Sequence, residues 1–287
     1  MKIGIALPTT IPGVRGDEVV EWARRAEAAG FSSLGTLDRI VYANYEPLVA
    51  FGAAAAVTER IGLMPTIAIL PYRANAALVA KQTATIQHLS GGRFGFGVAV
   101  GGRADDFEVS GVPMEGRGKR LEEMLEEIKR IWAGEERGYA GAIGPDVSKN
   151  PPPIIVGGQV DAAFRRAAKY GDGWIMGTAP PEIFPGAIEK LEAAWRAEGR
   201  DGEPRKLALS YFSLDDDPEG QTRRTIGHYY SFAPDYADQA VAGTPKGEDE
   251  VKERARAFEQ AGCDELIMAP ASSDPAQVDK LAAAVLP

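Results

Sequence analysis

Short apolar segments alternate with longer amphipathic segments along the whole chain. Eight segments have the length and the aliphatic or aromatic content of buried strands. They are residues 2–7, 32–37, 61–70, 94–100, 154–158, 174–178, 206–214 and 264–270. Continuous apolar runs of this kind are typical of parallel strands that are covered on both faces.

The segments between these strands have the period of amphipathic helices. They are residues 17–30, 45–60, 78–92, 118–132, 162–173, 181–199, 249–262 and 275–285. The first begins with acidic side chains and ends at Gly30, as the helix dipole and left-handed C-caps favour. Alternating strands and helices predict a parallel sheet, and eight such units predict one α/β domain, a (β/α)8 TIM barrel over residues 1–287. An open doubly wound sheet is the alternative.

Two connections are longer than ordinary loops. The segment 133–153 follows a helix, so we expect it at the N-terminal ends of the strands. The segment 215–246 follows the seventh strand, so we expect it at the C-terminal ends, where barrel enzymes have their active sites.

The composition and the net charge indicate which kinds of binding partner this protein can have. The formal net charge is −9, which argues against nucleic-acid binding because phosphate contacts need clustered Lys and Arg. No apolar run approaches the length of a membrane span, and the N-terminal apolar run is too short for a signal peptide. Cys263 is the only cysteine, so no intrachain disulfide can form. We therefore expect a cytoplasmic protein without membrane contact.

If the chain forms a barrel, we expect its functional residues at the C-terminal ends of the strands. The candidates there are Pro8, Thr9, Thr10, Asp38, Arg39, Leu70, Pro71, Tyr72, Arg73, Gly101, Gly102, Arg103, Asp106, Gly157, Gly158, Gln159, Gly177, Thr178, Tyr211, Ser213, Pro270 and Ser272. The sequence has only two histidines, far apart, and predicts no metal site. It also has no nucleophile elbow and no P-loop.

The pair Gly157–Gly158 follows a predicted strand and precedes a predicted helix. Glycines let backbone N–H groups approach a phosphate, and the N-terminus of a helix attracts anions. The same pair would also serve as a plain strand-to-helix turn, and the residues alone leave both interpretations open.

Four sequence blocks together resemble the bacterial luciferase-like superfamily of flavin- and deazaflavin-dependent oxidoreductases. They are AEAAGFSSLGTLDR, AKQTATIQHLSGGRFGFGVAVGG, DDFEVSGVPMEGRGKRLEEMLEEIKRIW and PPPIIVGGQVDAAFRRAAKYGDGW, and the pieces LSGGR and GDGW are particularly typical. The resemblance implies a (β/α)8 barrel that binds reduced FMN or the deazaflavin coenzyme F-420 across its mouth.

The resemblance also implies positions for the cofactor. The ring system would lie against the end of the third strand at Thr66 and Ile67, where the family often has a non-proline cis peptide bond. The phosphate would lie after the fifth strand, with the end of the sixth strand nearby. The residues so implied are Gly157, Gly158, Gln159, Val160, Gly177 and Thr178.

Two departures from the family pattern affect the predicted chemistry. Members often have a histidine for proton handling where this chain has Arg39, and an arginine cannot act as a general base. Arg39 could instead stabilise negative charge or form a surface ion pair. The helix after the fifth strand often begins with Ser or Thr, whereas this chain has Asp161, whose carboxylate we expect to cap the helix and point away from the phosphate.

Other residues are candidates for substrate contact or proton transfer. His228 lies in the long segment 215–246 and is the only histidine able to reach the mouth, although it could equally be an exposed helix residue. Arg73 could contact substrate or form a salt bridge. The aromatic residues near His228 could roof an apolar pocket or simply pack. With Arg39 as the other catalytic candidate, the predicted substrate-binding residues are Tyr72, Arg73, Tyr211 and Tyr229.

Three functions are compatible with these residues. The favoured one is a two-component monooxygenase that takes reduced FMN from a separate NAD(P)H-dependent flavin reductase and oxidises a small organic substrate with O₂. The second is a hydride-transfer oxidoreductase that uses coenzyme F-420, whose acidic tail could meet Arg165 and Arg166. The third is a flavin-binding protein without catalysis. Family members are commonly dimers, and the apolar segment 45–60 could form a homodimer face, although packing against the barrel would explain its composition as well.

Overall fold

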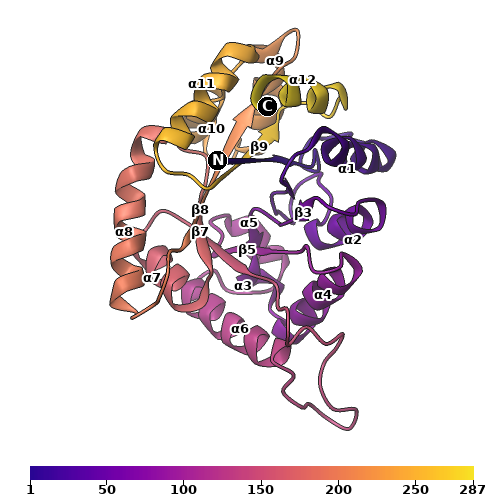
Figure 1. Ribbon diagram of the computed structural model, residues 1–287, viewed down its shortest axis with the longest axis vertical. Helices are drawn as coiled ribbons and strands as arrows, with labels where there is room; N and C mark the ends of the chain where they lie inside the picture. Colours follow the sequence, from indigo (N-terminus) through magenta and orange to yellow (C-terminus); the bar gives the residue numbers. More distant parts are fainter.

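The structure is a computed structural model that describes residues 1–287, and it is a closed parallel barrel surrounded by helices (Figure 1). The strands are β1 (Lys2–Ala6), β2 (Ser33–Gly35), β3 (Gly62–Leu63), β4 (Ala68–Ile69), β5 (Phe96–Ala99), β6 (Ile154–Gly157), β7 (Gly173–Met176), β8 (Arg205–Phe212) and β9 (Glu265–Pro270). They pair in the order β3-β2-β1-β9-β8-β7-β6-β5-β4, and all the pairs are parallel.

Twelve helices accompany the strands, and most of them follow one another around the outside of the barrel in chain order (Figure 1). They are α1 (Gly16–Ala29), α2 (Pro47–Val57), α3 (Leu70–Arg73), α4 (Ala76–Leu89), α5 (Ala104–Val109), α6 (Arg117–Trp132), α7 (Asp161–Tyr170), α8 (Phe184–Ala197), α9 (Pro218–Thr222), α10 (Pro234–Ala242), α11 (Gly247–Gln260) and α12 (Ala276–Val285). Two short turns complete the list, the 3₁₀ turn η1 (Pro181–Ile183) and the π-type turn η2 (Arg223–Gly227). None of these helices is long and apolar enough to cross a membrane.

The predicted barrel is confirmed, with one difference in its third strand. Residues 61–70 form two short strands, β3 and β4, which both contribute to the ring. Pro65 lies between them and has no N–H to donate, which interrupts the ladder toward β5. A bridge from Leu63 to Phe94 and the pairing of β4 with β5 close the sheet on itself. The open doubly wound alternative is therefore excluded.

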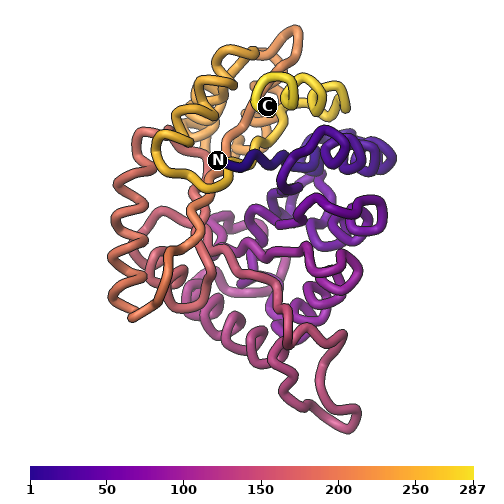
Figure 2. Tube along the Cα trace, viewed as in Figure 1, coloured from indigo at the N-terminus to yellow at the C-terminus, as the bar shows by residue number.

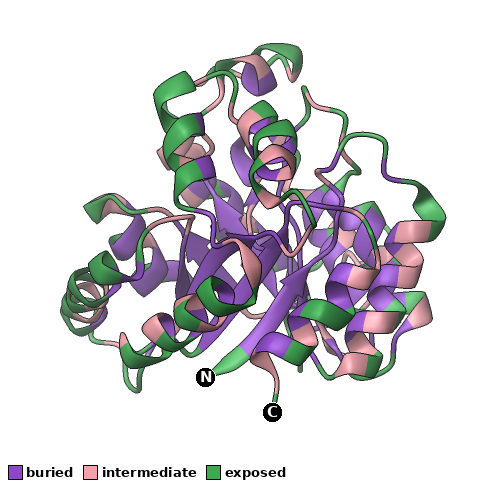
Figure 3. Cartoon of the chain, turned by 90° about the horizontal axis from the view of Figure 1, so that it is seen from above, coloured by how far each residue is buried: buried purple, intermediate pink, exposed green.

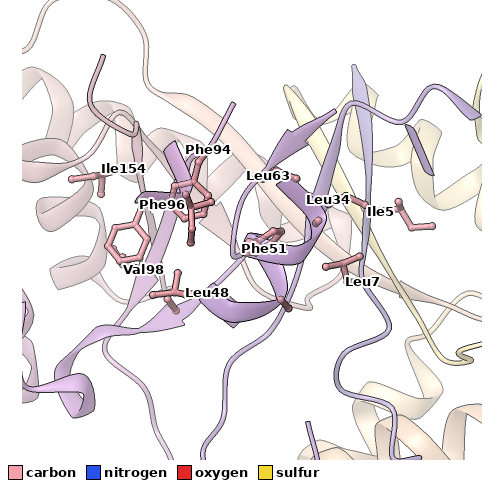
Figure 4. Close-up of a cluster of buried hydrophobic side chains, with 14 of the residues drawn as sticks. Ile5, Leu7, Leu34, Leu48, Phe51, Leu63, Phe94, Phe96, Val98 and Ile154 are labelled. Atoms are coloured by element: carbon pink, nitrogen blue, oxygen red, sulfur yellow. The ribbon is translucent and has the colours of Figure 1, made fainter. Parts of the chain in front are cut away.

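The largest apolar cluster fills the layer between the strands and the helices. Figure 4 shows Ile5, Leu34, Leu63, Phe94 and Phe96 with Leu48 and Phe51 of α2, and all of them are buried. The rings of Phe51 and Phe94 lie 6.1 Å apart in an edge-to-face arrangement. In Figure 3 the strands are almost entirely buried, and the exposed residues lie on the outer faces of the helices. Each helix therefore needs only one apolar face, as the periodicity predicts.

The two long connections lie where their places in the chain predict. The segment 133–153 leaves α6, projects from the barrel as a long loop (Figure 2), and returns at the N-terminal end of β6, where Pro153 accepts a hydrogen bond from Phe96. The segment 215–246 contains α9, η2 and α10 and covers the C-terminal ends of the strands.

Gly97 lets the interrupted third strand approach β5. A Cβ atom at this position would collide with the carbonyl oxygen of Pro65 and lie 2.6 Å from that of Thr66. We expect Gly97→Ala to lower the free energy of unfolding by at least about 2 kcal/mol, because the backbone at Pro65 must move. Urea unfolding followed by circular dichroism measures this loss.

Gly52 provides the matched control for that experiment. It lies inside α2, and a Cβ atom there would meet no atom within 4 Å. Gly52→Ala should stabilise the protein by roughly 0.5–1 kcal/mol through helix propensity. Equal stability of the Gly97→Ala variant and the wild type would contradict the proposed close approach.

Candidate functional site

The C-terminal ends of the strands surround two neighbouring cavities. The first has a volume of about 140 Å³ and lies between the ends of β2, β4 and β5. It is lined by Leu37, Asp38, Ile67, Ile69, Tyr72, Gly101, Gly102, Arg103, Asp106, Phe107, Tyr229 and Tyr230. The second, of about 340 Å³, lies between the ends of β7 and β8, α10 and α11, and its lining includes Thr178, Tyr211 and Tyr236.

A wall of tyrosines separates the two cavities. The ring of Tyr230 lies 4.9 Å from Tyr229 and 4.8 Å from Tyr236, edge to face in both cases. Its hydroxyl lies 3.1 Å from that of Tyr211, and Thr178 Oγ1 lies 2.9 Å from Tyr236 Oη. Burial raises the pKa of Tyr230 to about 12, so its hydroxyl stays protonated at neutral pH. Of the two interpretations of these aromatic residues, the structure supports a roof over the mouth.

Two arginines hold this roof against the barrel. Arg39 and Arg103 both donate to the carbonyl oxygen of Tyr229, at 3.5 and 3.1 Å. The guanidinium carbon of Arg103 lies 4.3 Å from the ring centre of Tyr229 and 4.2 Å from that of Phe232. Stacking of a guanidinium on aromatic faces combines dispersion with cation–π attraction. These two side chains therefore join three segments that are distant in sequence, which are β2, β5 and the 215–246 connection.

Arg39 is buried among carboxylates rather than directed into the first cavity. It donates to Asp105 at 2.8 Å, and its Nε lies 3.7 Å from Asp106 Oδ2. Asp106 in turn accepts from the backbone N–H groups of Ile40 and Val41 at 3.0 and 2.7 Å. These partners give Arg39 a structural role that competes with the predicted catalytic one. The sequence suggested two roles for Arg39, stabilisation of negative charge or a surface ion pair. The buried network is neither of them.

Asp38 and Arg73 form a second buried pair beside the first cavity. Asp38 Oδ2 accepts from Arg73 at 2.9 Å and from the N–H of Ile69 at 2.8 Å. Arg73 also pairs with Glu46 at 2.7 Å. Burial raises the pKa of Asp38, against the opposing effect of the Arg73 charge. Arg73 does not line the cavity, so its predicted substrate contact has no support from this geometry, whereas the salt-bridge alternative is confirmed.

The remaining residues predicted at the third strand and in the long connection lie at different depths. Ile67 and Tyr72 line the first cavity. Thr66 is fully buried, and its hydroxyl accepts from the N–H of Thr36 at 3.1 Å, below the cavity. The expected cis peptide bond at Thr66–Ile67 is wrong, since the cis peptide bond of this chain is Gly144–Pro145. His228 is exposed, and its Nδ1 lies 2.9 Å from Tyr42 Oη outside the cavity.

The turn between β6 and α7 has the features of an anion site. Gly158 has φ of 130°, a conformation that favours glycine, and a Cβ there would lie 2.9 Å from Cβ of Ala163. No side chain caps the first turn of α7 at Val160. A helix N-terminus without a capping side chain presents backbone N–H groups and the positive end of the helix dipole.

The neighbours of this turn leave its approach open. Val160 is 65% exposed. Asp161 does not cap α7 as we expected; it points away and pairs with Lys190 at 3.2 Å. Gly157 faces the barrel interior, where a Cβ atom on it would lie 3.6 Å from Ile67 Cδ1. The predicted residues of the fifth and third strands are therefore adjacent, while Gly177 and Thr178 follow on the next strand.

Sequence reasoning missed several contributors to the two cavities. The sequence gives no sign that Phe107, Leu37 and Ile69 face the same space, because each lies on a different element. Arg254 of α11 reaches the second cavity from the far end of the chain, where it donates to the carbonyl of Gly243 at 3.0 Å. No group of three or more His, Cys, Asp or Glu side chains is arranged to hold a metal ion.

Comparison with known sequences places this chain near proteins of one family. A family model described as luciferase-like monooxygenase matches residues 1–250. An uncharacterized protein of Mycobacterium tuberculosis is 37% identical over 174 residues, which are 57% of this chain and 61% of that protein. The match thus spans about three fifths of the length of this curated relative.

Two solved structures share the fold over nearly their whole length. A secondary alcohol dehydrogenase dependent on coenzyme F-420, in complex with an F-420–acetone adduct, has a TM-score of 0.83 at 20% identity and covers 99% of this chain and 98% of its own. A monooxygenase from Streptomyces bottropensis has a TM-score of 0.82 at 23% identity, covering 100% and 99%. At these identities the two similarities show the fold alone.

The buried network around Arg39 leads to a testable expectation. We expect Arg39→Ala to lower the free energy of unfolding by about 2–3 kcal/mol, because Asp106 stays buried without its cation and the roof loses an anchor. Thermal and urea unfolding measure the change. Arg165→Ala, which removes an exposed arginine of α7, should stay within about 0.5 kcal/mol of the wild type. An Arg39→Ala variant of unchanged stability would contradict the structural role.

Proposed function

This chain belongs to the luciferase-like monooxygenase family, and on that premise we propose that it is the oxygenating component of a two-component, FMN-dependent monooxygenase. It would receive reduced FMN from a separate NAD(P)H-dependent flavin reductase and oxidise a small organic substrate with O₂. The observation that carries the proposal is the uncapped N-terminus of α7 beside Gly158 at the mouth of a closed barrel.

The residues at this turn fit a phosphate monoester. The backbone N–H groups from Gly158 to Val160 would hold it, since the stretch contains no lysine or hydroxyl side chain. The absence of a Cβ at Gly158 keeps the approach free, and the pairing of Asp161 with Lys190 offsets the charge of the one nearby carboxylate. Helix N-termini stabilise anions through the same combination of free N–H groups and dipole.

The cavities at the mouth give the cofactor and substrate an environment with little water. Ile67, which lies near Gly157, would support the ring of the cofactor, and Thr178 follows β7, the strand that pairs with β6. Reduced FMN supplies the electrons that activate O₂, so that one oxygen atom enters the substrate and the other leaves as water. The roof of Tyr229 and Tyr230 excludes bulk water from the reaction.

The cations around α7 favour FMN over a cofactor with an acidic tail. Arg166, one of two candidates for binding such a tail, is already paired with Glu122 at 2.7 Å. FMN ends at its phosphate and therefore needs no further cation on the surface of α7.

A hydride-transfer enzyme that uses coenzyme F-420 is the second candidate. Arg165 is exposed on α7 and has no ion-pair partner, so it could contact an acidic tail. A secondary alcohol dehydrogenase dependent on F-420 shares the fold over 98% of its length. In this alternative the cofactor gives or takes a hydride and O₂ has no part in the reaction.

We also propose a homodimer formed through the outer faces of α2 and α4. Val49 of α2 is 70% exposed and Leu78 of α4 is 51% exposed, and both are large apolar side chains. Burying such residues against a second copy would remove apolar surface from water.

Titration of the purified protein with each reduced cofactor tests the proposed function. Under anaerobic conditions we expect reduced FMN to bind in the micromolar range and reduced F-420 to bind at least about tenfold more weakly, because Arg166, one of the two candidate partners of its acidic tail, is already paired with Glu122. Fluorescence or calorimetry measures both affinities. Tight binding of F-420 alone would overturn the monooxygenase proposal in favour of the second candidate.

A pair of substitutions at Gly158 tests the place of the phosphate. Gly158→Ala introduces backbone strain at φ of 130° and a contact with Ala163, whereas Gly158→Asp adds a negative charge to the same strain. We expect the Asp variant to bind reduced FMN at least about tenfold more weakly than the Ala variant. Equal affinities of the two variants would place the phosphate elsewhere.

A further inference from the structure

Arg254 of α11 borders the second cavity of the barrel mouth and makes no hydrogen bond to a carboxylate. Its guanidinium donates to the carbonyl oxygen of Gly243 at 3.0 Å, and its other N–H groups stay free. Burial lowers the pKa of Arg254, against the opposing effect of three glutamates nearby. A half-buried cation without an ion pair has lost part of its hydration, and a bound anion would compensate for that loss.

The three glutamates near Arg254 do not neutralise it inside the cavity. Glu182, Glu250 and Glu253 line an adjoining hollow that Arg254 also borders, and they act on its charge without a hydrogen bond to it. None of them lines the second cavity, in which Arg254 is the only charged residue. An anion in this cavity therefore meets one cation and no carboxylate.

The other walls of the second cavity are apolar or have hydroxyl groups that already have partners. Tyr211 Oη lies 3.1 Å from Tyr230 Oη, and Tyr236 Oη lies 2.9 Å from Thr178 Oγ1. The two remaining hydroxyls of the lining each donate to a backbone carbonyl oxygen. The apolar surface includes Ala179, Pro180, Ala240 and Ala242. The guanidinium of Arg254 is therefore the one charged anchor that the cavity offers to a ligand.

The size of the cavity and the shape of the guanidinium favour one class of anion. The volume of about 340 Å³ lies near the lower end of ordinary ligand sites, which have about 300–1,000 Å³. Such a space holds a molecule of the size of a substituted benzene ring. A carboxylate matches the planar fork of an arginine and accepts two parallel hydrogen bonds from it. A phosphate dianion would keep one uncompensated charge, because the lining supplies no second cation.

We propose that the second cavity binds a small organic monocarboxylate, which pairs with Arg254 and packs its apolar body against Tyr211 and Tyr236. The inference goes beyond the proposed function, because this cavity includes neither Ile67 nor the turn from Gly158 to Val160 and is formed without a cofactor. The tyrosine wall separates the bound carboxylate from the first cavity.

Two probes of equal shape, benzoate and benzamide, test the proposal without turnover. Both match a cavity of this size, and only benzoate has a negative charge. We expect the wild-type protein to bind benzoate in the millimolar range, and Arg254→Gln to weaken that binding at least about tenfold while the affinity for benzamide stays the same. Ligand-observed NMR with the purified protein measures both affinities.

Two further variants separate the loss of the charge from a general disturbance of α11. Arg256→Gln removes an exposed arginine of the same helix that does not line the cavity, so it should leave both affinities unchanged. Arg254→Lys keeps the charge without the fork and should retain part of the affinity for benzoate. The proposal fails if benzoate does not bind the wild type, if Arg254→Gln weakens both probes equally, or if Arg256→Gln weakens benzoate as strongly as Arg254→Gln.

Cofactor binding by the Arg254→Gln variant distinguishes the possible sources of the anion. We expect its affinities for reduced FMN and reduced F-420 to equal those of the wild type. A tenfold loss for FMN would show that Arg254 holds the phosphate of the cofactor, and a loss confined to F-420 would show that it holds the acidic tail. Either result overturns the proposal. If neither cofactor binds the wild type while the selectivity for benzoate depends on Arg254, the proposed function fails and the carboxylate site stands.

Discussion

Closure of the parallel sheet is the constraint on which the rest of this molecule depends. A parallel ring brings the C-terminal ends of all its strands to one rim, whatever their separation in sequence. The ring closes only because the third strand gives up part of its ladder at Pro65 and because Gly97 lets it approach β5. Ile67, Gly157 and Thr178 reach one mouth as a result, although more than one hundred residues separate the first from the last.

The periodicity of the sequence predicts the elements well because each element needs only local information. A strand covered on both faces is a short apolar run, and an outer helix has one apolar face, so both patterns are visible in the residues themselves. The division of residues 61–70 into β3 and β4 was harder to predict from the sequence. Pro65 indicates an interruption of the strand. The close approach that shapes this interruption involves Gly97, about thirty residues later in the sequence.

The site was predictable in position but not in detail. The rule for barrel rims located the turn between β6 and α7 and most of the first cavity, because the ends of strands can be located from the pattern. The same rule does not predict the hydrogen-bond and ion-pair partners of each side chain. Arg39 was prominent in the sequence, yet its guanidinium is occupied by Asp105, Asp106 and the carbonyl of Tyr229. Tyr72 was one candidate among many, and its burial beside Asp38 in the lining of the first cavity is visible only in the packed structure.

The central claim is that the turn between β6 and α7 holds the phosphate of the cofactor. A crystal structure of the protein with bound FMN tests it most directly. We expect phosphate oxygens within about 2.7–3.2 Å of backbone N–H groups between Gly158 and Val160. A phosphate bound at any other part of the rim, with this turn left in contact with solvent, would contradict it.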